Sequence, residues 1–365
     1  MSTSTTQTSA LPFTFGGFTI PAGCRRIFIT AELEPSNGDP RIQPTGFPDI
    51  GPVLYPDPAE KDGLICLIES EASMANRLEE VCFSNKYEGT LNNKFAGLPY
   101  LRAERAGNLK TSSTLDAHRF ASDYLARGRT DFGNGERTLA DHIKSVLGIA
   151  ADGKTMPIAN VPNVFPLVLG LDTMSLIHGF QVSNEQISFV GLRMARALSA
   201  SIIGIGCERI SVPGIKFNFG QVESESGQAL FQKTRITAKK ILARFSIDVA
   251  LLTTLRLVAP TDPLPAGHTA EVLQAARARL LLTIALWKVA AFLDLLDVEL
   301  SLRTECKLRL KSGISPTVKC EGGPTTSSDT FPFSSIAAAT LAGENSVISR
   351  AHLPTGRSPL TLQFA

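Results

Sequence analysis

The chain has 365 residues, with 36 Lys and Arg side chains against 34 Asp and Glu and a formal net charge of +2 at pH 7. This length allows one elaborated domain or two smaller ones, and the near-even charge excludes a protein that selects its partners by a large net charge alone. Charge is nevertheless unevenly distributed, because residues 1–70 carry four basic and eight acidic side chains whereas residues 231–319 carry fourteen basic and seven acidic. The sequence therefore predicts a basic face on a nearly neutral protein.

The composition also bears on compartment and membrane association. Six cysteines form no C-x-x-C pair and mostly lie within apolar patterns, which indicates reduced core residues, at positions 24, 66, 82, 207, 306 and 320. The first ten residues are rich in Ser and Thr and lack the charged start and apolar core of a signal peptide, so we expect a cytoplasmic protein. Residues 280–296 are the only candidate membrane span, but Lys288 and Asp294 interrupt them, which favours a buried helix.

The N-terminal part of the chain predicts two strands and a helix. Residues 25–35 alternate with period two, which is typical of a half-buried strand, and a long loop rich in Pro and Gly follows over residues 35–58. Leu64–Ile68 form a short apolar run that predicts a buried strand. Ser70 or Ser73 can cap the next helix, and one face of that helix would contain Met74, Leu78, Val81 and Cys82.

The start of this helix is a candidate binding site for an anion. We expect Asn76 and Arg77 close to the helix start. Free backbone N–H groups at a helix N-terminus, together with these two side chains, suit a phosphate oxygen. An ordinary capped helix with a solvated arginine is the alternative.

Residues 86–160 have the character of an insertion into a core fold. Gly, Asn and charged residues surround two predicted amphipathic helices, Leu115–Leu125 and one near Leu139–Leu147. We expect this region to lie outside the main sheet.

The C-terminal half predicts a second unit of strand, helix and strand. Ile241–Val249 alternate before the short helical segment LLTTLRLV, and Thr269 can cap a buried helix that runs to about Leu293. From Val298 to Lys311 the even positions are mostly apolar and the odd positions mostly cationic, which predicts one strand with a packed and a charged face. After Glu321 the chain is rich in Gly, Ser, Thr and Pro, and we expect it to pack poorly or to be ordered only by a neighbouring subunit.

Strand, helix and strand thus recur in both halves of the chain. This order predicts an α+β fold in which an open antiparallel sheet carries helices on one face, the ferredoxin-like or RRM-like arrangement. Helical and hairpin insertions would complete it.

Few residues suggest catalysis or metal binding. The five histidines form no H-x-x-x-H pair, and no Cys and His residues cluster at the spacing of metal ligands. The sequence also lacks a complete G-x-G-x-x-G, a Walker lysine motif and a G-x-S-x-G elbow, so we expect no catalytic residue, no metal and no cofactor. His118 is the best candidate for a general acid or base, and a structural role or simple hydrogen-bond donation is the alternative.

Three segments occur in the order of a known family. Leu64–Phe83 (LICLIESEASMANRLEEVCF) joins a strand to a Ser-rich helix start, residues 112–125 are SSTLDAHRFASDYL, and residues 193–204 are RMARALSASIIG. This combination resembles the CRISPR-associated RAMP proteins that form the backbone subunit of the type I-U, or I-G, Cascade complex. The likeness covers roughly residues 20–310, with Ser201 at a position where that family commonly has an acidic residue.

The resemblance implies a palm with inserted fingers and thumb. Residues 20–85 and 191–320 would form the two parts of an RRM-like RAMP palm, and residues 86–190 the fingers and thumb region. Residues 321–365 would be a low-complexity tail or a subunit contact. We expect a thumb-like hairpin within residues 155–190.

The resemblance also implies a function, that of a crRNA-binding filament subunit of a type I CRISPR interference complex in antiviral defence. Several copies would hold the sugar-phosphate backbone of the guide RNA and leave its bases free to pair with target DNA. The expected partners are crRNA, target DNA, further copies of the chain, a large subunit and a repeat-processing RAMP subunit, without a membrane. The alternative is a RAMP endoribonuclease that acts on repeat or target RNA and uses His118 with Asp116 or Asp123.

The expected RNA-binding residues are basic or polar and lie mostly in these motifs. Groups directed at phosphate are required, because a protein that carries any guide cannot read its bases. The set comprises Ser73, Asn76, Arg77, His118, Arg119, Arg193, Arg196, Arg303 and Lys307.

Overall fold

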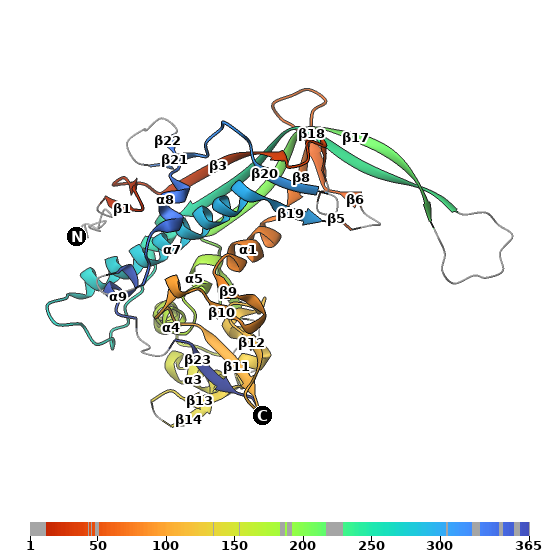
Figure 1. Ribbon diagram of the computed structural model, residues 1–365. Helices are drawn as coiled ribbons and strands as arrows, with labels where there is room; N and C mark the ends of the chain where they lie inside the picture. Colours follow the sequence, from red (N-terminus) through yellow and green to blue (C-terminus); the bar gives the residue numbers. More distant parts are fainter. Residues whose placement is uncertain are drawn as a thin grey trace, which may run out of the picture.

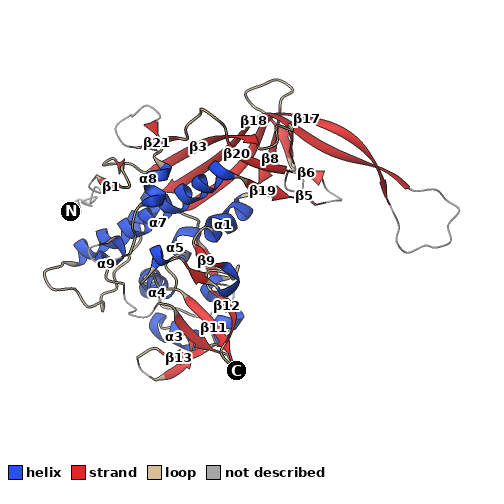
Figure 2. Cartoon of the chain, in the orientation of Figure 1, coloured by secondary structure: helices blue, strands red, loops and turns tan. Residues whose placement is uncertain are grey.

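The fold is of the mixed α+β class. It consists of one large antiparallel sheet with its helices, a second lobe below the sheet and a long arm to one side (Figures 1 and 2). The predicted α+β class is thereby confirmed. The computed structural model describes residues 12–42, 44, 46–47, 51–133, 135–152, 154–182, 187, 192–216, 229–303, 306–322, 329–342, 346–353 and 358–364.

Strand β3 (Arg26–Pro35) lies inside the large sheet, as the alternation of residues 25–35 predicts. The sheet contains ten strands in the described part of the chain, all paired antiparallel, along the main path β19-β20-β3-β18-β17-β8-β7. Its other members are β4 (Arg41–Ile42), β7 (Leu54–Pro56), β8 (Leu64–Glu69), β17 (Leu198–Lys216), β18 (Ala229–Asp248), β19 (Leu300–Arg303), β20 (Cys306–Leu310), β21 (Thr317–Glu321) and β22 (Asp329–Thr330).

The loop predicted for residues 35–58 contains several short strands. Besides β4 and β7 of the large sheet, it holds the antiparallel pair β5 (Gly46–Phe47) and β6 (Gly51–Pro52). Near the N-terminus, β1 (Phe13–Phe15) and β2 (Phe18–Ile20) form another short hairpin. These pieces are only two or three residues long, which fits a segment rich in Pro and Gly.

Helices α1 (Glu71–Glu80) and α7 (Ala270–Val298) pack beside each other below the sheet (Figure 1). Ser70, rather than Ser73, caps α1, because its side chain accepts a hydrogen bond from the Ser73 amide. The predicted cap Thr269 begins α7, which extends beyond Leu293. The short helix α6 (Val249–Thr254) follows β18 at the predicted place.

Residues 280–296 lie within α7 and form the predicted buried helix. Most of its side chains are inaccessible to solvent, and even Lys288 has 0% of its surface exposed. Across the described residues, no helix combines the length and the apolar character that crossing a bilayer requires.

The prediction of one continuous strand from Val298 to Lys311 is wrong. α7 continues through Val298, which is 77% exposed, and the chain then forms the antiparallel hairpin of β19 and β20. The alternation survives within β20, where Cys306, Leu308 and Leu310 are buried. Period-two patterning therefore marked the correct faces but could not reveal the reversal of the chain.

The second lobe contains a five-stranded sheet with the order β12-β11-β23-β13-β14, outside the large sheet as predicted for residues 86–160. Its strands, with those of two short hairpins, are β9 (Phe83–Asn85), β10 (Thr90–Leu91), β11 (Leu101–Arg105), β12 (Asn108–Ser112), β13 (Arg129–Asp131), β14 (Glu136–Thr138), β15 (Phe180–Val182), β16 (Leu192–Met194) and β23 (Leu360–Gln363). Its helices are α2 (Asp123–Arg127), α3 (Leu139–Leu147), α4 (Val164–Leu171) and α5 (Ser175–His178), with 3₁₀ turns η1 (Lys86–Glu88), η2 (Asn93–Phe95), η3 (Arg119–Ala121) and η4 (Ile158–Asn163).

The predicted helix over Leu115–Leu125 is wrong, whereas the predicted helix over residues 139–147 is confirmed as α3. The first segment divides into the turn η3 and the helix α2. Arg119 has a φ of 51°, which interrupts a right-handed helix. Asp116 stabilises the break, because its carboxylate accepts hydrogen bonds from the His118 amide at 2.9 Å and from Ser122 Oγ at 2.5 Å.

The segment after Glu321 is well packed in its described part, contrary to the prediction. β23 lies between β11 and β13, and Leu360 and Leu362 are buried. α8 (Phe333–Ala338) packs on α7, and α9 (Val347–Arg350) follows it. Several apolar residues of this segment are buried, so a low apolar content did not mean a lack of structure in the described part.

A two-stranded arm extends from one end of the large sheet (Figure 1). It consists of the far ends of β17 and β18, residues 210–216 and 229–235, beyond the last pairing of β18 with β4 at Ile236. The prediction of a thumb-like hairpin within residues 155–190 is wrong, because residues 158–182 form η4, α4, α5 and the short β15. The projecting hairpin is thus made from the two longest strands of the sheet.

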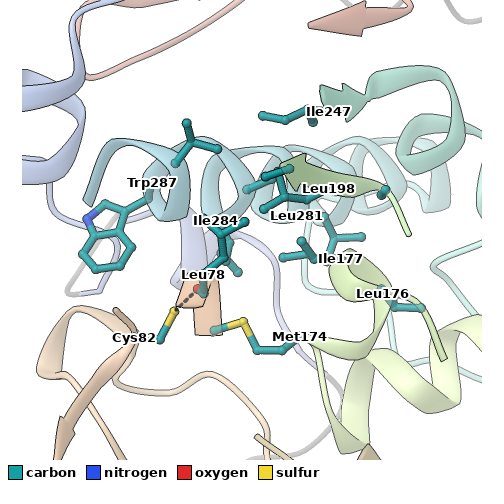
Figure 3. Close-up of a cluster of buried hydrophobic side chains, with 14 of the residues drawn as sticks. Leu78, Cys82, Met174, Leu176, Ile177, Leu198, Ile247, Leu281, Ile284 and Trp287 are labelled. Atoms are coloured by element: carbon teal, nitrogen blue, oxygen red, sulfur yellow. Dashed lines mark hydrogen bonds between the residues drawn. The ribbon is translucent and has the colours of Figure 1, made fainter. Parts of the chain in front are cut away.

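An apolar cluster joins the sheet, its helices and the second lobe (Figure 3). α1, α5, α7 and the start of β17 meet there through fully or almost fully buried side chains, including Leu78, Met174, Ile177, Leu198, Leu281 and Ile284. All six cysteines are free and buried, which confirms their predicted role as reduced core residues.

We expect Leu362→Ala to lower the free energy of unfolding by about 2–5 kcal/mol, because Leu362 is fully buried in the central strand of the lobe sheet. Urea unfolding followed by circular dichroism measures the change. Gln363→Ala, at the exposed next position, is the matched control and should change stability by less than about 0.5 kcal/mol. Equal unfolding midpoints for the two variants would contradict the packing of this segment.

Candidate functional site

The start of α1 is acidic, contrary to the expectation of a cationic anion site. Arg77 lies in the last turn of the helix, where its Nη2 donates to Glu69 Oε1 at 2.6 Å. Ser73 Oγ also donates to the Glu69 carboxylate, which is almost fully buried. Glu71 adds a negative charge in the first turn. Ser73 and Arg77 were predicted to donate to a phosphate, but both donate to the Glu69 carboxylate instead. The negative charges of Glu69 and Glu71 would therefore repel a phosphate at this helix start.

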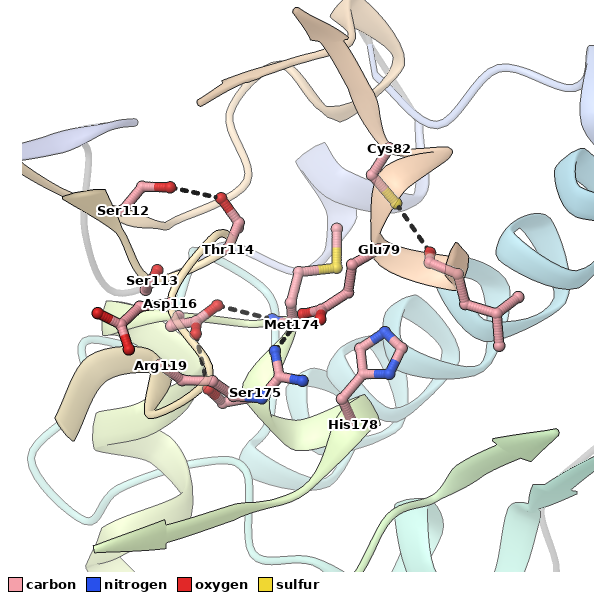
Figure 4. A network of polar contacts seen from close by, with 12 residues as sticks. Glu79, Cys82, Ser112, Ser113, Thr114, Asp116, Arg119, Met174, Ser175 and His178 are labelled. Carbon is pink, nitrogen blue, oxygen red and sulfur yellow. Dashed lines mark hydrogen bonds and ion pairs between the residues drawn. The ribbon is translucent and has the colours of Figure 1, made fainter. Parts of the chain in front are cut away.

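A buried ion pair joins the first two sequence motifs. Arg119, on the turn η3, is only 9% exposed and donates from Nη1 to Glu79 of α1 (Figure 4). Its left-handed backbone conformation is uncommon for a residue other than glycine. Since both partners lie in a region of low dielectric, this pair fixes the position of the loop that carries His118.

Asp172 is buried beside this ion pair. Its carboxylate accepts hydrogen bonds from the Met174 amide at 3.1 Å and from Ser175 Oγ at 2.6 Å, which closes the turn between α4 and α5. Burial raises the pKa of the Asp172 carboxyl to about 6, and the nearby Arg119 opposes that rise. The cluster therefore combines one firm ion pair with a carboxyl that titrates close to neutrality.

His178 and Lys288 form a buried hydrogen bond across the junction between the lobe and α7. Lys288 Nζ and His178 Nε2 are 2.7 Å apart, and both residues are almost inaccessible. Burial lowers the pKa of His178 well below its usual value, and the charges of Lys288, Arg119 and Arg196 act in the same direction. The neutral imidazole therefore accepts from the lysine. In the sequence, Lys288 was interpreted only as an interruption of an apolar helix. A lysine within a buried apolar helix nevertheless indicates that a polar partner lies buried beside it.

His118, Arg119, Arg193 and Arg196 lie on neighbouring segments, and we call this group the cationic cluster. The hairpin of β15 and β16 places Arg193 opposite Gln181, and Gly179 packs against the backbone of residues 194–196. A Cβ atom at Gly179 would lie 2.7 Å from the Met194 carbonyl oxygen, so only glycine permits this approach. A pocket of about 260 Å³ lies there, lined by Ala117, His118, Arg119, Gly179, Phe180 and Gln181.

The members of the cationic cluster differ in exposure. His118, Arg193 and Arg196 are exposed, whereas Arg119 is buried and paired. The second and third sequence motifs thus present three basic side chains from one anchored framework. Such a group can bind an anion such as phosphate.

The other predicted site residues lie elsewhere. Asn76 is exposed on α1, and Arg77 is close to β19, where its Nη2 lies 3.5 Å from the Ser301 carbonyl oxygen. Lys307 is exposed on β20 and forms an ion pair of 2.7 Å with Glu299. Arg303 ends β19, but the prediction for its side chain falls outside the described residues.

The face of the large sheet opposite α7 carries residues that the sequence reasoning missed. Phe245 points toward α7, with its ring centroid 6.0 Å from that of Phe292, so Arg244 next to it faces the other way. On that face Phe28 of β3 is 37% exposed, and Arg244 is also exposed. Their alternation with buried neighbours was visible in the sequence, but which face remained uncovered was not.

Metal ligation finds no support in the described ranges. Within them, no three His, Cys, Asp or Glu side chains gather in an arrangement that could hold a metal ion. Asp116, the predicted nuclease partner of His118, directs its carboxylate to a backbone amide and to Ser122.

We expect His178→Gln to reduce the loss of stability between pH 7 and pH 5. Folded His178 stays neutral because its pKa is lowered, whereas the unfolded chain takes up a proton at the ordinary value of about 6.5, so acid favours unfolding. Glutamine keeps an oxygen that can accept from Lys288 but does not titrate. Urea unfolding at both pH values measures the effect.

The other titrating groups are the same in wild type and variant, so any difference between their pH dependences of stability comes from His178. Asp172, with its raised pKa, acts in the opposite direction in each of them. An identical dependence on pH in wild type and variant would contradict a buried neutral histidine.

Comparison with known proteins identifies the family. No curated protein matches the sequence. Residues 27–209 match the model of a family described as CRISPR-associated protein GSU0053 (Cas_GSU0053). This segment runs from β3 into β17 and includes α1 and the whole cationic cluster. Because the match spans half of the 365 residues, the chain belongs to the GSU0053 family of CRISPR-associated proteins.

Proposed function

We propose that this protein is a crRNA-binding backbone subunit of a type I-G (I-U) Cascade complex. It would hold guide RNA so that the bases pair with target DNA. Its partners would be crRNA, target DNA, further copies of itself, a large subunit and a repeat-processing RAMP subunit. Membership of a CRISPR-associated family implies a role in CRISPR defence, and the projecting arm on the large sheet is the observation that carries the finer proposal.

The topology of the large sheet supports an RRM-like palm. β3, α1, β17, β18, α7 and β20 follow one another as β-α-β-β-α-β, and the strands have the spatial order β20-β3-β18-β17. This order and these antiparallel pairings are those of a split β-α-β unit. α7 covers one face and leaves Phe28 and Arg244 on the other, where RRM-type sheets contact RNA.

The arm supports assembly with further copies. Two strands alone are at best marginally stable in water, and their outer edges offer unpaired backbone groups. Residues 210–216 and 229–235 have no third strand in the described part of the sheet. We propose that the arm is the thumb and contacts a neighbouring subunit and its guide RNA, in place of residues 155–190.

The cationic cluster supports binding to the RNA backbone. His118, Arg193 and Arg196 present donors without reading a base edge, which suits a protein that carries guides of any sequence. We propose that the protein binds without cutting, because the Asp116 carboxylate accepts from Ser122 Oγ and from the backbone amide of His118 rather than from the His118 side chain.

We expect the double substitution Arg193→Ala and Arg196→Ala to weaken binding of single-stranded RNA at least about tenfold, because each charged hydrogen bond to phosphate contributes about 1.5–3 kcal/mol. Fluorescence anisotropy with two unrelated guide sequences at several salt concentrations measures this. Two unrelated guide sequences of equal uracil content should bind to wild type equally and more weakly as salt rises, and the variant should show a shallower salt dependence.

Arg129→Ala is the matched control, because Arg129 is an exposed arginine of the lobe outside the cluster, and its binding should remain within about twofold of wild type. Unchanged affinity in the double variant would remove the cluster from the RNA site. Incubation of the protein with guide-paired RNA and divalent metal tests the alternative. Cleavage that disappears in His118→Ala or Asp116→Ala would establish a nuclease instead.

A protein with a shortened arm should bind a single RNA site normally but fail to assemble into multimers on long RNA. Ser211 and Thr234 face each other in the arm, so an Asn-Gly turn can replace residues 212–233 without disturbing the sheet. Analytical ultracentrifugation on RNA of increasing length measures assembly. Normal multimers with the shortened arm would refute its role as a thumb.

A further inference from the structure

A second pocket, of about 580 Å³, lies where the lobe meets the segment between α6 and α7. α3 and α4 form two of its walls, the loop after β13 forms a third, and Ala259–Asp262 close it from the side of the large sheet. None of its lining residues belongs to the cationic cluster. Its volume is in the range typical of small-molecule sites.

The wall of this pocket is aromatic and apolar. The rings of Phe132 and His142 stack with their centroids 4.1 Å apart and their planes at 7°. Val146 and Leu167 also line the pocket, and Val146 is 45% exposed at its edge. Flat rings and aliphatic side chains together favour a flat, largely apolar ligand.

The polar groups of the wall select for hydrogen-bond donors. Asn163 Oδ1 and His142 Nδ1 are buried and have no hydrogen-bond partner in the described part of the structure. Thr261 adds a hydroxyl group, whereas the Asp131 carboxylate accepts from the Gly133 and Gly135 amides and Asp262 forms an ion pair with the buried Arg277. None of the described lining residues is a lysine or arginine. Burial lowers the pKa of His142 to about 4, so its ring is neutral at physiological pH. The two carboxylates disfavour a phosphate, and the unpartnered Asn163 Oδ1, with the one acceptor nitrogen of a neutral His142 ring, suits a neutral ligand with N–H groups.

We propose that this pocket binds an unpaired nucleobase through its flat face and its N–H edge. A nucleobase is planar, uncharged and rich in N–H donors, which are the three properties that the wall selects. This site is additional to the RNA-backbone contacts of the cationic cluster. Uracil has one N–H donor, whereas adenine, cytosine and guanine carry amino groups, so the acceptors of the wall favour the amino-bearing bases.

Saturation-transfer NMR and calorimetry with the full chain and with adenosine, cytidine, guanosine and uridine test the site. The three amino-bearing nucleosides should bind, and each should bind about threefold or more tightly than uridine, because one further hydrogen bond contributes roughly 0.5–1.5 kcal/mol. Absence of saturation transfer from every nucleoside would overturn the proposal.

Substitutions at the pocket locate the bound nucleoside. Val146→Trp should fill the pocket and weaken binding at least about tenfold, whereas Ser145→Trp, at the exposed neighbouring position of α3, should leave it within about twofold. His142→Phe keeps a ring against Phe132 but removes its nitrogen atoms, and Asn163→Ala removes the amide. Each should weaken binding about threefold to tenfold while thermal unfolding stays cooperative.

Two outcomes would place the ligand elsewhere and overturn the proposal. One is full nucleoside binding by the Val146→Trp variant, and the other is loss of nucleoside binding in the Arg193→Ala and Arg196→Ala variant, which leaves the pocket intact. Binding of N-acetyltryptophanamide without any nucleoside would likewise assign the pocket to a protein side chain. Nucleoside binding that persists in a variant unable to bind RNA supports a separate base site.

Discussion

The buried hydrogen bond between Lys288 and His178 is the constraint on which the arrangement of the two lobes depends. The middle of α7 around Lys288 is apolar and buried, and an ammonium group there is tolerated only if a partner reaches it. That partner comes from α5, so the lobe must sit where the imidazole can accept from Lys288 Nζ. The ion pair of Glu79 and Arg119 adds a second buried contact of the same kind between α1 and the lobe.

These two contacts give the exposed charges their fixed positions. Arg119 is paired with Glu79, and this ion pair anchors the turn that carries the exposed His118 beside the segments of Arg193 and Arg196. A buried, paired arginine fixes the position of its loop, whereas exposed arginines remain available to bind an anion. Glu69 occupies Arg77 in the same way as Glu79 occupies Arg119, so neither of these two arginines is available to an anion.

The structure also separates two kinds of polar surface. The cationic cluster offers donors and positive charge, while the larger pocket offers acceptors on an aromatic and apolar wall. A nucleotide presents a negative backbone and a neutral base with N–H groups, so each surface is suited to a different part of the same polymer. The arm continues two strands of the large sheet, and α7 lies along that sheet (Figure 2).

The sequence by itself determined the local elements whose patterns are complete within a short segment. The alternation of β3, the cap at Thr269 and the buried character of α7 were all predictable, because side-chain periodicity and capping depend only on near neighbours. The three ordered motifs likewise indicated the CRISPR-associated family that the match to residues 27–209 establishes. The RNA-binding role expected of His118, Arg119, Arg193 and Arg196 stays a prediction, although their segments do lie next to one another.

Only the tertiary structure decided what those residues contact. That Arg77 is held by Glu69, that β19 and β20 form a hairpin, and that β23 completes the sheet of the lobe each depend on contacts that side-chain periodicity does not encode. The last of these joins segments that lie far apart in the chain. The arm could not be assigned for the same reason, since β17 and β18 alternate like any strands and differ only in lacking neighbours at their far ends. Local patterns specify which side of an element is apolar, whereas the partner that covers it is chosen by packing over the whole chain.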